Sequence, residues 1–72
     1  MSDYRADLYW DSTYEIVLSL IEVYPEADVE MVGVDQLYQW IIALPHFADD
    51  PNLVTNAILN DILREWYEEV NP

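Results

Sequence analysis

The sequence has 72 residues and a formal net charge of −13, because fifteen Asp and Glu face only two Arg and no Lys. This balance excludes binding to nucleic acid or to anionic membrane surfaces, which needs several Lys or Arg on one face, and it favours basic protein patches and hard cations as partners. The absence of Cys excludes disulfides, thiolate metal sites and cysteine nucleophiles.

The chain is expected to start with a flexible lead over residues 1–7, MSDYRAD, which is too polar for a signal peptide. Residues 8–72 should form a single domain, because 53% of the sequence is hydrophobic and three Trp and six Tyr can build a dense core. No apolar run approaches the roughly 18 residues that a membrane span needs. We therefore expect a cytoplasmic protein, and self-repulsion favours a monomer.

A first helix is predicted to begin at Ser12, which forms a capping box with Glu15. It should end near Tyr24, since Pro25 disfavours a helical residue before it. Apolar residues at spacings of three and four give this helix one buried face: Ile16, Val17, Leu20, Ile21 and Tyr24.

The connector over residues 25–34 could contain a short extended piece built from its apolar residues, Val29, Met31, Val32 and Val34. Gly33 is the only glycine, so we expect it at a turn or bulge with positive φ. Asp35 is the predicted N-cap of a second helix, which Pro45 ends. The inward face of this helix is Leu37, Trp40, Ile41 and Leu44.

Residues 45–52 are expected to form a loop that Phe47 anchors in the core. The third helix should start between Pro51 and Asn56, with Asp50 or Thr55 as its cap. Its apolar stripe is Ile58, Leu59, Ile62, Leu63, Trp66 and Val70. Nearby carboxylates on the same helix should pair with Arg64.

The predicted fold class is mainly α: a compact three-helix domain that resembles a modified winged helix, with at most a very short extended segment. The residues expected to be buried or nearly so are Trp10, Ile16, Leu20, Tyr24, Trp40, Ile41, Phe47, Ile58, Ile62 and Trp66.

Several segments in this order resemble the IscX family, small acidic accessory proteins of bacterial iron–sulfur cluster assembly. The segments are Trp10-Asp11-Ser12, Tyr24-Pro25-Glu26-Ala27-Asp28, Gln39-Trp40-Ile41, Phe47-Ala48-Asp49-Asp50-Pro51 and the stretch from Ile58 to Trp66. The resemblance covers about residues 8–70. It implies a fold similar to a modified winged helix, weak binding of iron (Fe²⁺ or Fe³⁺) through surface carboxylates, and docking on a basic patch of the cysteine desulfurase IscS in competition with the bacterial frataxin.

The chain departs from that family pattern in the second helix and the loop after it. Ala43, Pro45, His46 and Ala48 stand where the family pattern has acidic residues before the Phe and a further Asp after it. The departures move the expected metal ligands to the first helix and the turn after it. The candidate metal ligands are Glu15, Glu22, Glu26 and Asp28, and no tightly bound cofactor is expected.

Glu15, Glu22 and Glu26 recur at spacings of seven and four, so they lie along one stripe of the first helix and its end. Long-range attraction from such a stripe speeds encounter with a basic partner. The full set of predicted partner-binding residues is Asp11, Glu15, Glu22, Glu26, Asp28, Asp49, Asp50, Glu68 and Glu69.

The predicted function is therefore an acidic adaptor or regulator of iron–sulfur cluster assembly rather than an enzyme, since no nucleophile–base pair or cofactor loop accompanies the carboxylates. Charge alone also allows an acidic DNA mimic that inhibits a basic nucleic-acid-binding protein.

Overall fold

The computed structural model describes residues 7–71, which form three α-helices and two short 3-10 helices. In chain order these are α1 (Thr13–Val23), η1 (Val29–Met31), α2 (Val34–Ile42), η2 (Pro51–Leu53) and α3 (Asn56–Val70). The prediction of a mainly α, three-helix domain is confirmed. The predicted flexible lead falls, apart from the exposed Asp7, outside the described residues, and it stays a prediction.

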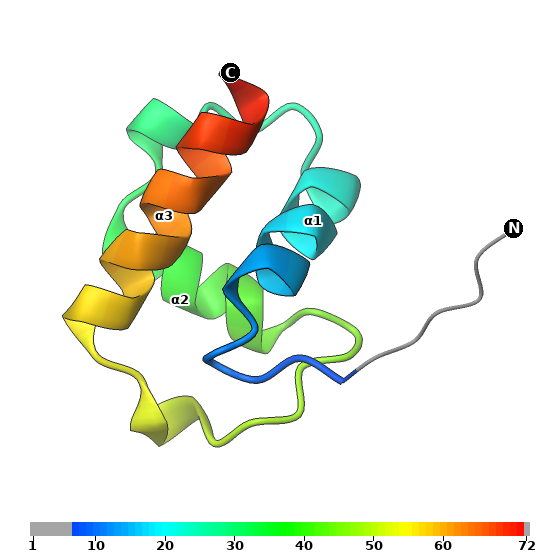
Figure 1. Ribbon diagram of the computed structural model, residues 1–72, viewed down its shortest axis with the longest axis vertical. Coiled ribbons are helices and arrows are strands. Elements are labelled where there is room, and N and C mark those ends of the chain that lie inside the picture. Colours follow the sequence, from blue (N-terminus) through cyan, green and yellow to red (C-terminus); the bar gives the residue numbers. More distant parts are fainter. Residues whose placement is uncertain (1–6, 72) are drawn as a thin grey trace, which may run out of the picture.

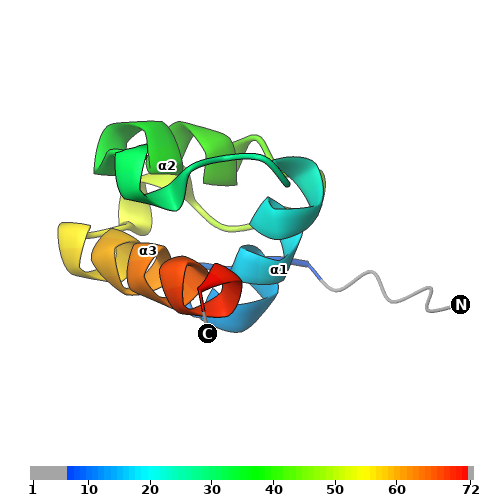
Figure 2. The same ribbon diagram turned by 90° about the horizontal axis from the view of Figure 1, so that it is seen from above.

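The helices α1 and α3 make the most extensive contact in the molecule, and both run from the bottom toward the top of Figure 1. In Figure 2, α2 and α3 lie one above the other with α1 beside them. A chain of aromatic rings connects the end of α1 to the last turns of α3: the ring centroid of Trp40 lies 4.1 Å from that of Tyr24, on which it stacks, and 6.3 Å from that of Trp66, which it meets edge-on. The two helices therefore finish toward the same end of the domain.

The core lies between the three helices and is entirely apolar within the described residues. Its buried members are Leu8, Trp10, Ile16, Val17, Leu20, Val29, Val32, Leu37, Ile41, Leu44, Leu59, Ile62 and Trp66. The other residues expected to be buried, Tyr24, Trp40, Phe47 and Ile58, are half-buried and pack against this cluster. Val70 was predicted to face inward, and this is wrong: it is exposed, because it is the last residue of α3 and extends past the packed part of the helix.

The start of α1 differs in one detail from its prediction. Ser12 is the N-cap residue, but its side chain makes no capping hydrogen bond, so the capping box with Glu15 is wrong. The backbone N–H of Ser12 instead donates to the carbonyl of Tyr9 at 2.8 Å, and this tight turn gives Ser12 a φ of −90° and a ψ of 57° rather than the extended conformation of a capping residue. The predicted end of the helix at Tyr24, before Pro25, is confirmed.

The connector between α1 and α2 corrects three predictions. It contains the 3-10 helix η1 instead of an extended piece, and no β-strand occurs anywhere in residues 7–71. Gly33 has a φ of −82°, and a Cβ added there would meet nothing within 4 Å, so this position does not require glycine. Asp35 is not the N-cap of α2: Gly33 is, and Asp35 lies in the first turn.

The start of α3 agrees with its prediction, because Thr55 is the N-cap and its hydroxyl accepts a hydrogen bond from the N–H of Ile58 at 3.2 Å. Arg64 pairs with Asp61 at 3.2 Å, and both side chains are well exposed, so the pair adds little stability. None of the described helices is long and apolar enough to cross a lipid bilayer.

Candidate functional site

The segment before α1 is held against the loop after α2 by hydrogen bonds between residues about 40 positions apart. The N–H of Leu8 donates to the carbonyl of His46 at 2.7 Å, and the N–H of Ala48 donates to the carbonyl of Leu8 at 2.9 Å. These two bonds form an isolated parallel bridge between Leu8 and Phe47. We call residues 8–10 together with residues 46–50 the clasp.

Two of the predicted partner-binding acids are part of this clasp. The carboxylate of Asp49 accepts hydrogen bonds from the N–H of Trp10 at 2.9 Å and from the N–H of Asp50 at 2.7 Å. The carboxylate of Asp50 accepts from the N–H of Asn52 at 2.9 Å, which caps η2. Both carboxylates therefore stabilise the fold by accepting backbone hydrogen bonds. The sequence does not reveal this role, because an exposed acid and a hydrogen-bonded acid look alike in it.

Trp10 is the centre of the clasp. Its indole N–H donates to the carbonyl of Asp50 at 2.8 Å, and its ring is buried. The ring stacks on Tyr38 with centroids 6.2 Å apart and meets Phe47 edge-on at 5.0 Å. A buried Trp with its N–H satisfied is a strong anchor for two chain segments.

A second group of predicted acids behaves differently. Glu22 lies in the last turn of α1 and Glu26 in the turn that follows, while Glu68 and Glu69 lie in the last turn of α3. All of them are exposed, and within residues 7–71 no hydrogen bond or ion pair joins their side chains to another group. We call these residues the negative end of the domain.

The backbone adds to the negative potential there. The C-terminal end of a helix carries about half a negative charge from its unpaired carbonyls, so cations are favoured in the last turn and anions are disfavoured. Neither α1 nor α3 has a basic residue in its last turn. The carboxylates in these last turns therefore weaken the helices slightly and add to the negative field of the two helix ends.

The remaining predicted acids lie at two separate places in the fold. Asp11 and Glu15 are exposed at the start of α1, at the opposite end of that helix from Glu22. Asp28 is the N-cap of η1, and its carboxylate accepts from the N–H of Glu30 at 3.2 Å. The structure therefore does not gather all the predicted acids on one surface.

The predicted metal ligands are also spread out. Within residues 7–71, no group of three or more His, Asp and Glu side chains is placed so that it could hold one metal ion. Glu15 and Glu22 are separated by two turns of α1, and Asp28 is already engaged with Glu30. These residues do not fit a preassembled metal centre.

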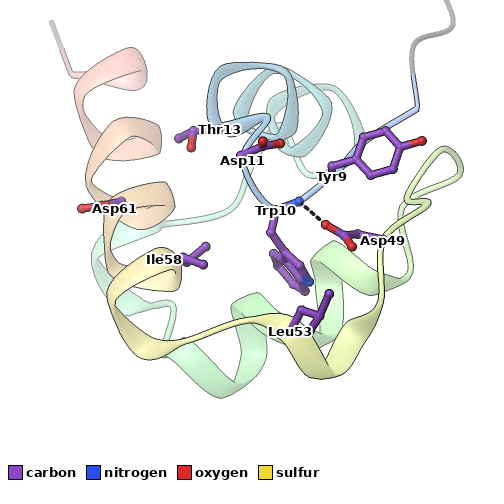
Figure 3. Close-up of a pocket in the computed structure, with 8 residues that line it drawn as sticks. All are labelled: Tyr9, Trp10, Asp11, Thr13, Asp49, Leu53, Ile58 and Asp61. Atoms are coloured by element: carbon purple, nitrogen blue, oxygen red, sulfur yellow. Dashed lines mark hydrogen bonds between the residues drawn. The ribbon is translucent and has the colours of Figure 1, made fainter.

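A groove with a volume of about 620 Å³ opens between the clasp and the first turns of α1 and α3 (Figure 3). Its apolar lining consists of Trp10, Leu53 and Ile58, with Tyr9 at one side. The polar lining residues are Asp11, Thr13, Asp49 and Asp61. No stretch of the sequence signals this groove, because its residues come from three segments that only the fold brings together.

A smaller groove lies on the other side of α3, between that helix and η1. Val29, Val32 and Leu63 form its apolar lining, and Arg64 is the one basic residue that the described part of the chain contributes to it. Arg64 pairs with Asp61, which lines the first groove, so this one ion pair offsets a charge in each groove.

Comparison with known proteins adds two findings. Residues 8–71 match the family model described as iron-sulphur cluster assembly. An uncharacterized protein of Pseudomonas aeruginosa is 37% identical over 62 residues, which cover 86% of this chain and 94% of that protein. The matched range coincides with the clasp and the three helices together, so the likeness extends over the whole described domain.

Proposed function

Because this chain belongs to the iron-sulphur cluster assembly family, we propose that it acts there as a non-catalytic adaptor that binds a basic patch on an IscS-like cysteine desulfurase through its negative end. The observation that carries the proposal is the placement of Glu22, Glu26 and the Glu68–Glu69 pair where two helices finish without a basic residue. In this position the carboxylates are free to meet Lys or Arg of a partner. The family match favours a partner in cluster assembly over the nucleic-acid-binding protein that charge alone also allows.

The physical basis of this docking is long-range attraction. Complementary charge across an interface raises the association rate, suppresses wrong partners and weakens as salt is added. A basic patch set against the negative end would satisfy both the carboxylates and the unpaired carbonyls of the two helix ends. Bacterial frataxin, which the family resemblance names as a competitor, would then exclude this protein by occupying the same basic patch.

The test is binding of a purified IscS-like desulfurase by calorimetry at several salt concentrations. The double variant Glu22→Lys/Glu26→Lys should weaken binding at least about tenfold at low salt, since like charges set against each other cost several kcal/mol. The matched control is Asp7→Lys/Asp35→Lys, which changes the net charge equally but leaves the negative end intact. The control should retain most of the affinity.

Equal losses in the two double variants would show that only net charge matters and would contradict docking at the negative end. Unchanged binding in the first variant, with its helical spectrum intact, would contradict the proposal altogether.

We also propose that the carboxylates of α1 and the turn after it bind iron loosely, as cargo and not as a resident cofactor. Oxygen donors without thiolates suit iron and other hard cations. The exposure of Glu15, Glu22 and Glu26 supports exchangeable binding, and the absence of a preassembled ligand group in residues 7–71 argues that the affinity is low. Titration with Fe²⁺ without oxygen should broaden amide resonances within residues 11–28. Broadening spread evenly over the domain, or none at all, would contradict this proposal.

A further inference from the structure

The groove beside the clasp exposes apolar surface that the fold does not need. Leu53 in η2 is 64% exposed and Tyr9 is 44% exposed, although both border the groove. Figure 3 shows Leu53 and Ile58 on two sides of the opening, with the Trp10 ring between them. Hollowed apolar surface with a polar margin is typical of a site where another molecule binds.

The charged residues that line this groove are all acidic. Asp11, Asp49 and Asp61 come from three different segments, and among residues 7–71 no Lys, Arg or His lines the opening, although Asp61 pairs with Arg64 just outside it. Asp49 is held by its bonds to the clasp, so its negative charge is fixed in the wall. The groove therefore favours a ligand that is both apolar and positively charged.

This combination decides between the possible occupants. A second copy of the chain would bring another −13 charges to an acidic margin, which disfavours association. A metal ion is disfavoured, because the margin carboxylates do not form a ligand group within the described residues. A protein segment with an apolar side chain beside Lys or Arg satisfies both the apolar floor and the charged margin.

We propose that this groove binds an extended segment of a partner protein in which an apolar side chain enters between Leu53 and Ile58 while neighbouring Lys or Arg side chains meet the acidic margin. The groove lies at the start of α1 and α3, and the negative end lies where these helices finish. The two surfaces share no residue and are separated by about the length of α3, roughly 22 Å for its fifteen residues. The groove is thus a second docking site, and its existence does not depend on the identity of the desulfurase as partner.

The test uses three capped peptides and amide chemical shifts. The peptide Gly-Arg-Leu-Arg-Gly carries both features, Gly-Arg-Ser-Arg-Gly lacks the apolar side chain, and Gly-Gln-Leu-Gln-Gly lacks the charges. The first peptide should shift the amides of Leu53, Ile58 and Asp61 and leave that of Glu22 in place. The other two should bind at least about fivefold more weakly.

Two matched variants test which surface is responsible. Leu53→Ser should weaken binding of the Arg-Leu-Arg peptide about tenfold, as expected for loss of the contact that buries one leucine side chain. Leu18→Ser removes another exposed leucine, 42% exposed, from the outer face of α1 and should change the affinity less than twofold. Asp11→Asn should reduce the salt dependence of binding.

Each other result overturns the proposal. Equal affinities for the three peptides would show binding by charge or by apolar contact alone. Equal effects of Leu53→Ser and Leu18→Ser, with native spectra for both, would place the peptide elsewhere. Shifts confined to the negative end, or no shifts at millimolar peptide, would mean that the groove does not bind such a segment. Because the desulfurase is absent from this experiment, its outcome is separate from that of the docking test above.

Discussion

The clasp and the negative end both contain carboxylates, but the carboxylates have opposite effects on the stability of the fold. In the clasp, the carboxylate of Asp49 accepts two backbone N–H groups and that of Asp50 caps the turn that follows. At the negative end, Glu22 and Glu68 are exposed and have no hydrogen-bond or ion-pair partner within residues 7–71. The first region stabilises the fold through its acids, and the second keeps its acids available at some expense of helix stability.

This difference teaches that composition alone cannot assign the role of an acid in such a protein. The sequence places Asp49, Asp50, Glu22 and Glu68 in one predicted binding surface. The structure separates them by what their oxygens contact. Carboxylates that accept backbone N–H groups are positioned and partly shielded, whereas free carboxylates at helix C-termini can gain only from a partner that brings positive charge.

The largest expected effect comes from removing the centre of the clasp. Trp10→Ala should lower the free energy of unfolding by about 3–5 kcal/mol, as for other buried aromatic side chains, because it empties part of the core and releases the Asp50 carbonyl. Urea denaturation followed by circular dichroism measures this. For a domain this small, the variant should be substantially unfolded without denaturant. A loss below about 1 kcal/mol would mean that the clasp is not part of the cooperative fold.

Asp49 should show a smaller but distinct effect. Asp49→Ala leaves the N–H groups of Trp10 and Asp50 without their acceptor, and each unsatisfied group costs about 1–3 kcal/mol where it is shielded from water. Asp49→Asn keeps one acceptor oxygen and should lose less. Both variants are compared with Glu22→Gln by their denaturation midpoints. The free energy of unfolding of Glu22→Gln should stay within about 0.5 kcal/mol of the wild-type value. Equal losses in Asp49→Ala and Glu22→Gln would remove the distinction between the two regions.

The helix starts offer a matched pair. Thr55→Ala should destabilise the domain by about 1 kcal/mol, because the Thr55 hydroxyl accepts the N–H of Ile58. Ser12→Ala should lose clearly less, since Ser12 makes no such bond at the start of α1. Thermal unfolding curves recorded in the same buffer provide the comparison. A larger loss for Ser12→Ala would restore the capping box that the sequence predicts.

The smallest expected effect has the opposite sign. Glu22→Gln/Glu68→Gln removes an anion from the last turn of α1 and of α3 and should stabilise the domain by about 0.3–1 kcal/mol at low salt. The gain should shrink as salt screens the charges. The same variant should bind the desulfurase more weakly, so that stability and binding change in opposite directions. A destabilised variant would show that these carboxylates have a structural partner.

The sequence alone determines the local features of this protein. Apolar residues at spacings of three and four predict three helices, Pro25 and Pro45 predict two helix ends, and Thr55 is correctly named as a possible cap. These signals succeed because a helix and its ends depend on neighbouring residues. The net charge is likewise a property of the chain itself.

Only the tertiary structure decides which acids are free and where the groove beside the clasp forms. The bonds between Trp10 and residues 49–50 join positions 39 and 40 apart, and no periodic pattern reports such a contact. Gly33 and Asp35 were misassigned for a related reason, since α2 starts directly after η1 and its C-cap residue, which bury Val29 and Val32 in the core. The groove forms only where three separate segments of the chain meet. Burial of Trp10 against residues 49 and 50 brings two of these segments together, so the same long-range contacts form both the clasp and the groove beside it.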